Sequence, residues 1–490
     1  MRFIKKISYT FIALSLIISM NSCEDWLDLM PPDGLVKDEY WKSKEDVEAV
    51  LMASYRSFAA MSYRLFYYGE LRADMIGEGS LMRSNYRSIY QGNLYPDNWL
   101  VNWSNFYSII NYCNTLLKYA PEVKKEDPTF SNYTYETYRS EAIFLRSLAY
   151  FYLVMIYKEV PLVLEASDTD AQDFFPAKTD GEVVLERIKE DLLEIINTIP
   201  REYETNDKTR GRATQAAAYA LLADIALWNF NYEECIQYVG QIENNNLYKL
   251  VPGGDWFKIF SEGNTLEGIF ELQFDEELGQ SNFIYNETRY DYVVAGDYAL
   301  RLLTPEVSQE IIRGNGSLRP TDKMIWKYAG AAPDRLSLRP GNEAGSANYI
   351  IYRLAGVKLM KAEALSQLGR YNEALAIIND IRNRAFVQPI ADITETPHAF
   401  EDLILEERAR ELAFEGKRWY DLLRMGRRNN YERKDKLIEI IIKDLPATQK
   451  RVMASKLTDP YGWYWPIYQS EIENNPNLSQ NPYYQTYGED

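Results

Sequence analysis

Histidine, cysteine and nucleotide-binding motifs are scarce in this sequence. Its 490 residues include one histidine, His398, and three cysteines. One imidazole cannot build a zinc site that needs two or three of them. The sequence also has no Gly-x-Ser-x-Gly elbow of a serine hydrolase, no Gly-x-Gly-x-x-Gly and no Gly-x-x-x-x-Gly-Lys phosphate loop. We therefore expect no catalytic residues, no metal ligands and no cofactor.

The acidic residues leave one enzymatic alternative open. A glycosidase needs only two carboxylates, and 72 acidic side chains make a chance pair certain. A surface glycan hydrolase therefore stays an alternative. Asp168, Asp170 and Asp173 could bind calcium through carboxylate oxygens. Their loop lacks the glycine and the distal glutamate of an EF-hand, which favours a solvated acidic loop.

The N-terminus has the pattern of an export signal. Three basic residues precede an apolar run from 7 to 20, and Cys23 follows shortly after it. This run is too short to cross ~30 Å of hydrocarbon, so we interpret 1–22 as a signal peptide. Cys23 stands where bacterial lipoproteins are acylated, although Met20 replaces the usual leucine. We expect lipidation at Cys23 and no later segment able to span a bilayer.

The overall charge argues against nucleic acid as a partner. Removal of 1–22 takes away three positive charges and moves the net charge from −18 to −21. Nucleic acid requires a basic surface, so we expect none to bind. The two other cysteines, Cys113 and Cys235, lie among apolar residues in helical patterns and are expected to be buried free thiols.

Tyrosine is over-represented, with 39 residues against 19 phenylalanines and 10 tryptophans. A tyrosine ring combines an apolar face with a polar tip, so part of this surplus could form a recognition surface. We expect most of these residues to pack between helices.

Apolar periodicity predicts a mainly α-helical chain. Two regions lack it: 60–100, and 250–345, which we interpret as loops with a few short strands because of their Gly, Pro and Asn residues. The predicted helices are Val47–Phe58 after a capping-box-like Ser43 and Asp46, Asn105–Tyr119, Tyr138–Ile156, Gly181–Ile199 and Thr214–Trp228.

Two segments resemble tetratricopeptide helix pairs. Asn348–Ala385 contains two apolar stripes separated by Gly369, with small alanines where the helices would cross. A looser copy runs from Leu222 to Cys235. The copies are far apart in the sequence, so we expect dispersed repeats.

The segment Glu401–Met425 has an unusual charge density along an apolar seam that includes Trp419. We predict one continuous helix with Trp419 buried. Its arginines suggest an anion site, but pairing with neighbouring carboxylates such as Glu406–Arg410, Glu415–Arg418 and Asp421–Arg424 is the favoured interpretation.

Several stretches resemble the SusD/RagB family. The run Glu406–Arg424 is similar to its ER-x-x-E-x-AFEG-x-RW-x-DL-x-R motif, and Trp465–Tyr483 is similar to its closing motif. Further similar stretches begin at Cys23, Ala142, Gly211, Glu267 and Arg353, so the resemblance covers nearly the whole chain.

The resemblance implies a tetratricopeptide-like helical-pair scaffold that carries an irregular ligand-binding lobe. It divides the chain into an N-terminal SusD-like half, 23–235, and a C-terminal RagB/SusD half, 236–490, within one globule. It also implies a lipid-anchored, surface-exposed protein of the cell outer membrane, which binds oligosaccharides and delivers them to a SusC-like TonB-dependent transporter. An oligopeptide-binding member of the same family is the alternative.

The candidate glycan-binding residues come from the two regions without periodicity. A sugar ring has apolar faces ringed by hydroxyls, so its site needs exposed aromatic rings and polar side chains. The family places its ligand on these regions, and loops on a rigid scaffold commonly carry binding residues. The candidates are Asp74, Arg83, Tyr86, Tyr90, Asn98, Trp99, Tyr285, Arg289, Tyr290 and Tyr292.

Overall fold

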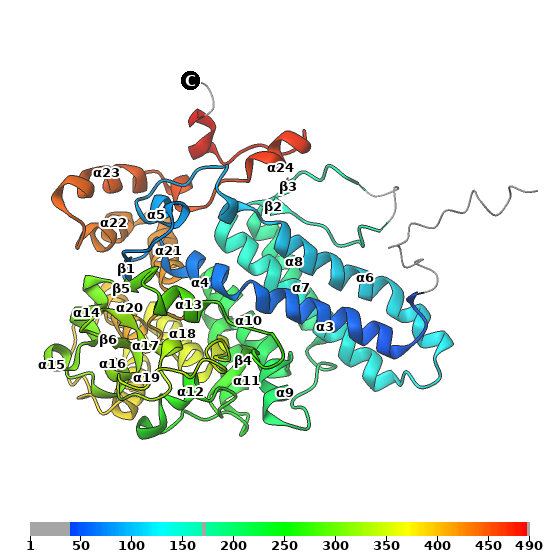
Figure 1. The fold of residues 1–490 in the computed structure, drawn as a ribbon, viewed down its shortest axis with the longest axis horizontal. Coiled ribbons are helices and arrows are strands. Elements are labelled where there is room, and N and C mark those ends of the chain that lie inside the picture. Colours follow the sequence, from blue (N-terminus) through cyan, green and yellow to red (C-terminus); the bar gives the residue numbers. More distant parts are fainter. Residues whose placement is uncertain (1–39, 169–172, 488–490) are drawn as a thin grey trace, which may run out of the picture.

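The computed structural model describes residues 40–168 and 173–487. The predicted signal peptide and Cys23 lie outside these residues. The described chain is mainly α-helical with a few two-stranded sheets, as predicted. Figure 1 shows long helices on one side and a lobe of short elements on the other.

Four long helices pack together in the N-terminal region (Figure 1): α3 (Lys44–Ala60), α6 (Ser104–Glu126), α7 (Asn132–Tyr157) and α8 (Gly181–Ile195). The predicted capping box begins α3, where the Asp46 carboxylate accepts the Ser43 backbone N–H at 2.8 Å. Helix α7 is long and apolar enough to cross a membrane, so the expectation of no such segment was wrong. Its apolar stretch is wholly buried in the protein, which makes it the central core helix.

The two predicted tetratricopeptide-like pairs are confirmed as α10 (Gln215–Trp228) with α11 (Tyr232–Glu243) and α18 (Leu354–Gln367) with α19 (Tyr371–Arg384). Gly369, with φ of 74°, follows the end of α18. Although these pairs are distant in sequence, α11 packs against α18. The expected boundary after residue 235 lies inside α11, and one hydrophobic cluster runs from Val47 to Tyr484. The division into two halves, 23–235 and 236–490, therefore remains a proposal based on the sequence resemblance.

The lobe, formed mainly by the predicted irregular region 250–345, contains more helix than the sequence predicted. It has the expected short strands, but also short helices of four to seven residues that are too brief to show periodicity. The helices are α12 (Lys258–Ser261), α13 (Ile284–Arg289), α14 (Asp297–Leu303), α15 (Pro305–Ser308), α16 (Ile311–Ser317) and α17 (Trp326–Ala329). The antiparallel strand pairs are β1 (Ile76–Glu78) with β5 (Val293–Ala295), β2 (Val160–Pro161) with β3 (Lys178–Thr179), β4 (Gly268–Leu272) with β8 (Tyr349–Arg353), and β6 (Leu318–Arg319) with β7 (Met324–Ile325).

The region 60–100 is also more regular than predicted. It contains α4 (Ser62–Glu70), β1, α5 (Ser84–Tyr90) and the start of a 3-10 turn, η1 (Trp99–Val101). Helix α4 was missed because all its residues except Tyr63 are buried, which leaves no alternation of apolar and polar faces.

The prediction of one helix over Glu401–Met425 was wrong. Helix α20 (Pro397–Glu411) ends before a tight turn, and α21 (Arg418–Tyr431) begins after it. Gly416 has φ of 70° and lies so close to Gly69 that a Cβ on Gly69 would be 1.9 Å from its carbonyl oxygen. The apolar seam continues through the turn, which explains the error, and Trp419 is buried as predicted.

Seven further elements are present in the described residues. They are α9 (Asn206–Gly211), η2 (Gly253–Asp255), α22 (Lys434–Ile442), α23 (Ala447–Leu457), η3 (Pro460–Trp463), α24 (Gln469–Asn474) and η4 (Pro482–Tyr487).

A buried ionic cluster joins α20 to the lobe. The Glu411 carboxylate lies 2.6 Å from Arg353 Nη1, 3.3 Å from Arg313 Nη1 and 2.5 Å from Arg384 Nη2. The ionic cluster also includes Glu267, Glu310, Glu407, Glu415 and Lys327. The arginines of the segment pair with carboxylates, as the favoured interpretation predicted, but some of these partners, such as Asp74 for Arg418 and Glu363 for Arg424, lie outside the segment. The pairs Glu406–Arg410 and Asp421–Arg424 are present, but Glu415 bonds Lys327 and Arg353 instead of Arg418.

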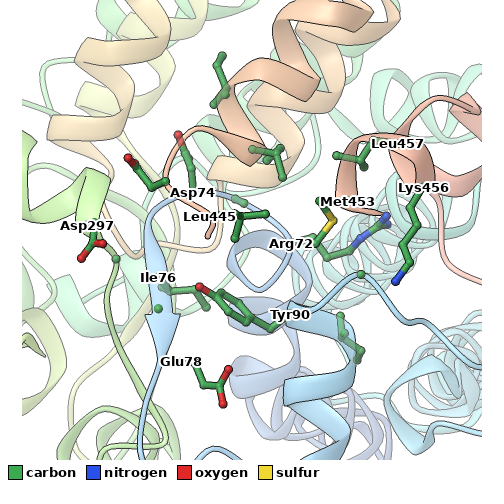
Figure 2. Close-up of a pocket in the computed structure, with 18 of the residues that line it drawn as sticks. Arg72, Asp74, Ile76, Glu78, Tyr90, Asp297, Leu445, Met453, Lys456 and Leu457 are labelled. Atoms are coloured by element: carbon green, nitrogen blue, oxygen red, sulfur yellow. The ribbon is translucent and has the colours of Figure 1, made fainter. Parts of the chain in front are cut away.

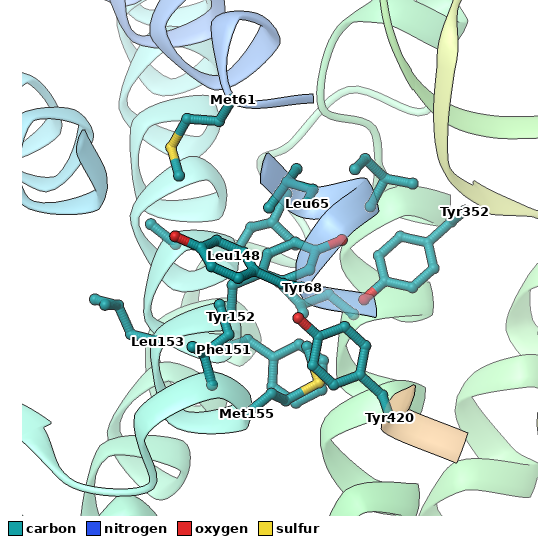
Figure 3. Close-up of a cluster of buried hydrophobic side chains, with 14 of the residues drawn as sticks. Met61, Leu65, Tyr68, Leu148, Phe151, Tyr152, Leu153, Met155, Tyr352 and Tyr420 are labelled. Carbon is teal, nitrogen blue, oxygen red and sulfur yellow. The ribbon is translucent and has the colours of Figure 1, made fainter. Parts of the chain in front are cut away.

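The tyrosine surplus is largely explained by packing. Figure 3 shows Tyr68 of α4, Tyr152 of α7, Tyr352 of β8 and Tyr420 of α21 gathered in the core. All four are buried. The free thiols Cys113 and Cys235 are buried as predicted, and burial raises the pKa of Cys113 to about 12.

We predict that Glu411→Gln destabilises the protein by about 3–5 kcal/mol at neutral pH, because it removes the carboxylate on which Arg313, Arg353 and Arg384 converge and leaves an excess of buried positive charge. The surrounding arginines hold the pKa of Glu411 well below its ordinary 4.5. The stabilisation that ionised Glu411 contributes is therefore fully present above its unfolded-state pKa of 4.5, and it is lost as the pH falls through the lower pKa of the folded state. Chemical denaturation between pH 3 and pH 8 should show the two proteins converging in acid.

Glu70→Gln is the matched control. Glu70 is buried without an ion pair in the described chain, and its Oε1 accepts the backbone N–H groups of Gly416 and Lys417. Burial raises the pKa of Glu70 to about 8. The stability that protonated Glu70 contributes is therefore lost as the pH rises from about 4.5 through 8. Glu70→Gln should match wild type in acid and exceed it at pH 9. Equal losses for both variants at pH 7 would contradict the assigned roles.

Candidate functional site

Strands β1 and β5 bring the two predicted binding stretches together. Ile76 pairs with Ala295, and Glu78 pairs with Val293. Beyond β1, the Ser80 backbone N–H donates to the Asp291 carboxylate at 3.1 Å. Gly79 permits this approach, since a Cβ there would be 2.1 Å from the Asp291 carbonyl oxygen. Loops more than 200 residues apart in the sequence therefore lie side by side.

Three aromatic side chains, Tyr63, Trp99 and Phe283, neighbour one another, and we call them the aromatic row. The Tyr63 ring centroid lies 6.2 Å from that of Trp99 and 6.4 Å from that of Phe283. Phe283 is 52% exposed, while Tyr63 and Trp99 are half-buried. The Arg64 guanidinium lies 4.7 Å from the Trp99 ring centroid and covers one face of that ring.

Arg83 supplies a polar group that is linked to the row through Tyr86, which neighbours both Arg83 and Trp99. The Arg83 side chain is 52% exposed, lies 4.8 Å from the centroid of Tyr292, and is 3.3 Å from the Glu287 carboxylate. Glu287 also accepts the Tyr67 hydroxyl at 2.6 Å. Burial raises the pKa of Glu287, while Tyr67 and Arg83 oppose that rise. Arg83 is thus oriented by Glu287 and Tyr292, with half of its surface still open to solvent.

Tyr86 lies beneath both groups. Its ring is 6.1 Å from Trp99 and 4.2 Å from Tyr67, and the Arg83 guanidinium lies 5.6 Å away. The side chain is fully buried, so it presents no face to a ligand. Its hydroxyl has no hydrogen-bond partner within the described part of the chain. Sequence alone could not reveal this, because α5 was not predicted and its inward face was unknown.

Asn98 and Asp74 have structural partners. Asn98 Oδ1 accepts the Leu100 N–H at 3.0 Å and thereby begins the turn that carries Trp99. Asp74 forms a two-point ion pair with Arg418, at 2.7 and 2.9 Å. Neither residue extends a free polar group over the aromatic row.

The remaining candidates are spread over the lobe. Tyr290 is 51% exposed, whereas Tyr285 is buried. The Arg289 guanidinium lies 5.7 Å from the Tyr285 ring and 6.0 Å from the Tyr290 ring. Tyr90 and Asp74 line a separate cavity beside β1 (Figure 2). The structure therefore groups Arg83, Tyr86, Trp99 and Tyr292 but does not join all ten candidates.

Sequence reasoning missed Tyr63, Arg64 and Phe283. The first two were overlooked because α4 lacks helical amphipathicity, although the run Tyr63-Arg64-Leu-Phe-Tyr-Tyr combines aromatic and basic residues. Phe283 lies within the second predicted region, 250–345, but was not among the candidates.

The possible calcium loop offers no complete site in the described residues. Lys118 Nζ lies 2.8 Å from the Asp168 carboxylate, and Asp170 lies outside the described residues. Within residues 40–168 and 173–487, no cluster of three or more His, Cys, Asp or Glu side chains could hold a metal ion.

Comparison with known proteins identifies the family. Residues 324–484 match the model of the SusD family, and 25–227 match one described as starch-binding associating with outer membrane. SusD-like protein P38 of Formosa agariphila is 25% identical over 99% of this chain and 100% of its own length. A SusD-like protein of Bacteroides ovatus is 25% identical over 86% of this chain and 83% of its own.

Solved structures show the same fold. A SusD superfamily protein of Bacteroides vulgatus superposes with a TM-score of 0.75 at 21% identity, over 91% of this chain and 100% of its own. A laminarin-binding SusD-like protein gives a TM-score of 0.70 at 21% identity, over 90% and 99%. Together the family models span more than half of the sequence. This chain is therefore a member of the SusD/RagB family.

Proposed function

We propose that this protein binds oligosaccharides on the aromatic row and does not cleave them. The observation that carries the proposal is the spacing of Tyr63, Trp99 and Phe283, at 6.2 and 6.4 Å, beside a half-exposed Arg83. Aromatic rings can cover the apolar faces of sugars, and Arg83 can donate to their hydroxyls. The starch-binding description of the matching family and the laminarin-binding neighbour support a glycan ligand.

The candidate residues take different parts in this proposal. Phe283, Trp99 and Tyr63 provide stacking surface, and Arg83 with Tyr292 provides the polar edge. Tyr86 supports Trp99 from below. Tyr290 is exposed on the same lobe and could extend contact to a longer chain. Asn98 acts by holding the Trp99 turn.

We predict that Phe283→Ala weakens binding of the preferred glycan about tenfold or more, which corresponds to about 1–3 kcal/mol for one large apolar contact. Phe283 is half-exposed, so its loss should leave the melting temperature nearly unchanged. Calorimetry against a panel of oligosaccharides measures both the ligand and the loss.

Tyr133→Ala is the matched control, since Tyr133 is 70% exposed at the start of α7, away from the row. It should bind like wild type. If Phe283→Ala and Trp99→Ala both bind normally, the glycan site lies elsewhere. Binding of peptides but of no glycan would favour the oligopeptide alternative, and new reducing ends after incubation would favour the hydrolase.

We further propose that the protein is anchored in the outer membrane by lipid on Cys23 and faces the outside. The apolar segment before Cys23 and the family description of outer-membrane association support this. Cys23→Ala should abolish labelling by radioactive palmitate and release the protein from the membrane fraction. Undiminished label in that variant would contradict the anchor.

Delivery to a SusC-like TonB-dependent transporter completes the proposed function. The support is membership of the SusD/RagB family, whose implied partner is such a transporter. Affinity purification from membranes in mild detergent should recover a large outer-membrane transporter in stoichiometric amounts. Repeated recovery of this chain alone would contradict a stable complex.

A further inference from the structure

A cavity of about 210 Å³ separates the β1–β5 ribbon from the C-terminal helices (Figure 2). One wall comes from β1, β5 and the end of α5, including Tyr90. The opposite wall comes from α22, α23 and η3, including Met453 and Leu457. Its volume is below the about 300–1,000 Å³ typical of drug-sized ligands, so it suits a small molecule such as one sugar unit.

The carboxylates of this cavity are already neutralised. Four acidic residues line it, and each has a basic partner in the described structure. The pairs are Asp74 with Arg418 at 2.7 Å, Glu78 with Arg87 at 2.6 Å, Asp297 with Lys323 at 3.2 Å, and Asp444 with Arg301 at 2.6 Å.

Two lining cations have no carboxylate partner among the described residues. Arg72 donates to the carbonyl oxygens of Gly462 and Trp463, both at 2.6 Å, and stacks on Trp419. Lys456 Nζ lies 3.3 Å from the Gln91 carbonyl oxygen and also donates to the Asn93 side chain. These neutral acceptors leave two positive charges uncompensated. Figure 2 shows the two side chains on the same side of the cavity.

We propose that this cavity binds a small sugar acid, whose carboxylate lies against Lys456 and Arg72 and whose ring lies against Tyr90. A carboxylate would neutralise the cations through charge-assisted hydrogen bonds. The Tyr90, Met453 and Leu457 side chains offer apolar contacts to carbon atoms, and the ion-paired carboxylates that line the cavity can accept hydrogen bonds from hydroxyl groups. This site is separate from the aromatic row and does not depend on the proposed glycan-binding role.

Sodium glucuronate is the probe for a free sugar acid, and methyl β-glucuronide is the probe for an acid at the end of a glycan chain. Calorimetry should detect binding of at least one of them to the wild-type protein, with glucose at the same concentration giving no heat. Binding of methyl β-glucuronide would show that the cavity accepts an acid at the end of a glycan chain. Binding of glucuronate but not of the glucuronide would show that it accepts only the free acid.

Lys456→Gln should weaken this binding about tenfold, the loss expected for one charge-assisted hydrogen bond, while Lys456→Arg should retain it. Lys450→Gln on the same helix is the control and should bind like wild type. Arg72 is left intact because it holds the η3 turn. No heat from either acid, or equal binding by Lys456→Gln and wild type, would overturn the proposal. Loss of acid binding in Phe283→Ala would also overturn it, by placing the acid on the aromatic row.

The neutral-glycan test separates the two sites. Lys456→Gln should bind the preferred neutral glycan like wild type, because Lys456 does not contact the aromatic row. Failure of the sugar-acid site would thus leave the glycan-binding proposal standing, and failure of the aromatic row would leave this one standing.

Discussion

Arginines from α16, β8 and α19 converge on the carboxylate of Glu411 at the end of α20. Arg353, at the N-cap of α18, also contacts Glu267 and Glu415, so the chain segments before β4 and after α20 share one set of buried charges. Such a cluster is costly to desolvate, but an unpaired member would cost more. The cluster therefore ties α16, β8, α19 and α20 together through paired buried charges.

A second close contact orients the region that carries the aromatic row. Gly69 of α4 touches Gly416, and the Glu70 side chain accepts the backbone N–H groups of Gly416 and Lys417 just before α21. Tyr63 and Arg64 lie on the same short helix. The motif that identifies the family therefore does not contact the proposed ligand. It positions α4 and the lobe, and these elements present the side chains that do.

The parts of the structure that were predictable depend on local pattern. Long amphipathic helices, the two helix pairs, buried Trp419 and the buried thiols all follow from apolar spacing. The turn at Leu412–Lys417 did not, because its apolar residues continue the helical seam. The pairing of Asp74 with Arg418 joins residues 344 positions apart, and nothing in either segment specifies it. The two candidate binding regions could be proposed from their composition. The burial of Tyr86 and the position of Tyr63 in the aromatic row could not, because both depend on contacts between distant segments.

The central claim is that a glycan occupies the aromatic row on the joined loops. A crystal structure of the protein with the tightest-binding oligosaccharide from a glycan panel tests it most directly. The account predicts a sugar ring over Trp99 or Phe283, with a hydroxyl group within hydrogen-bond distance of Arg83. A well-ordered glycan bound elsewhere, with the row left uncovered, would contradict it.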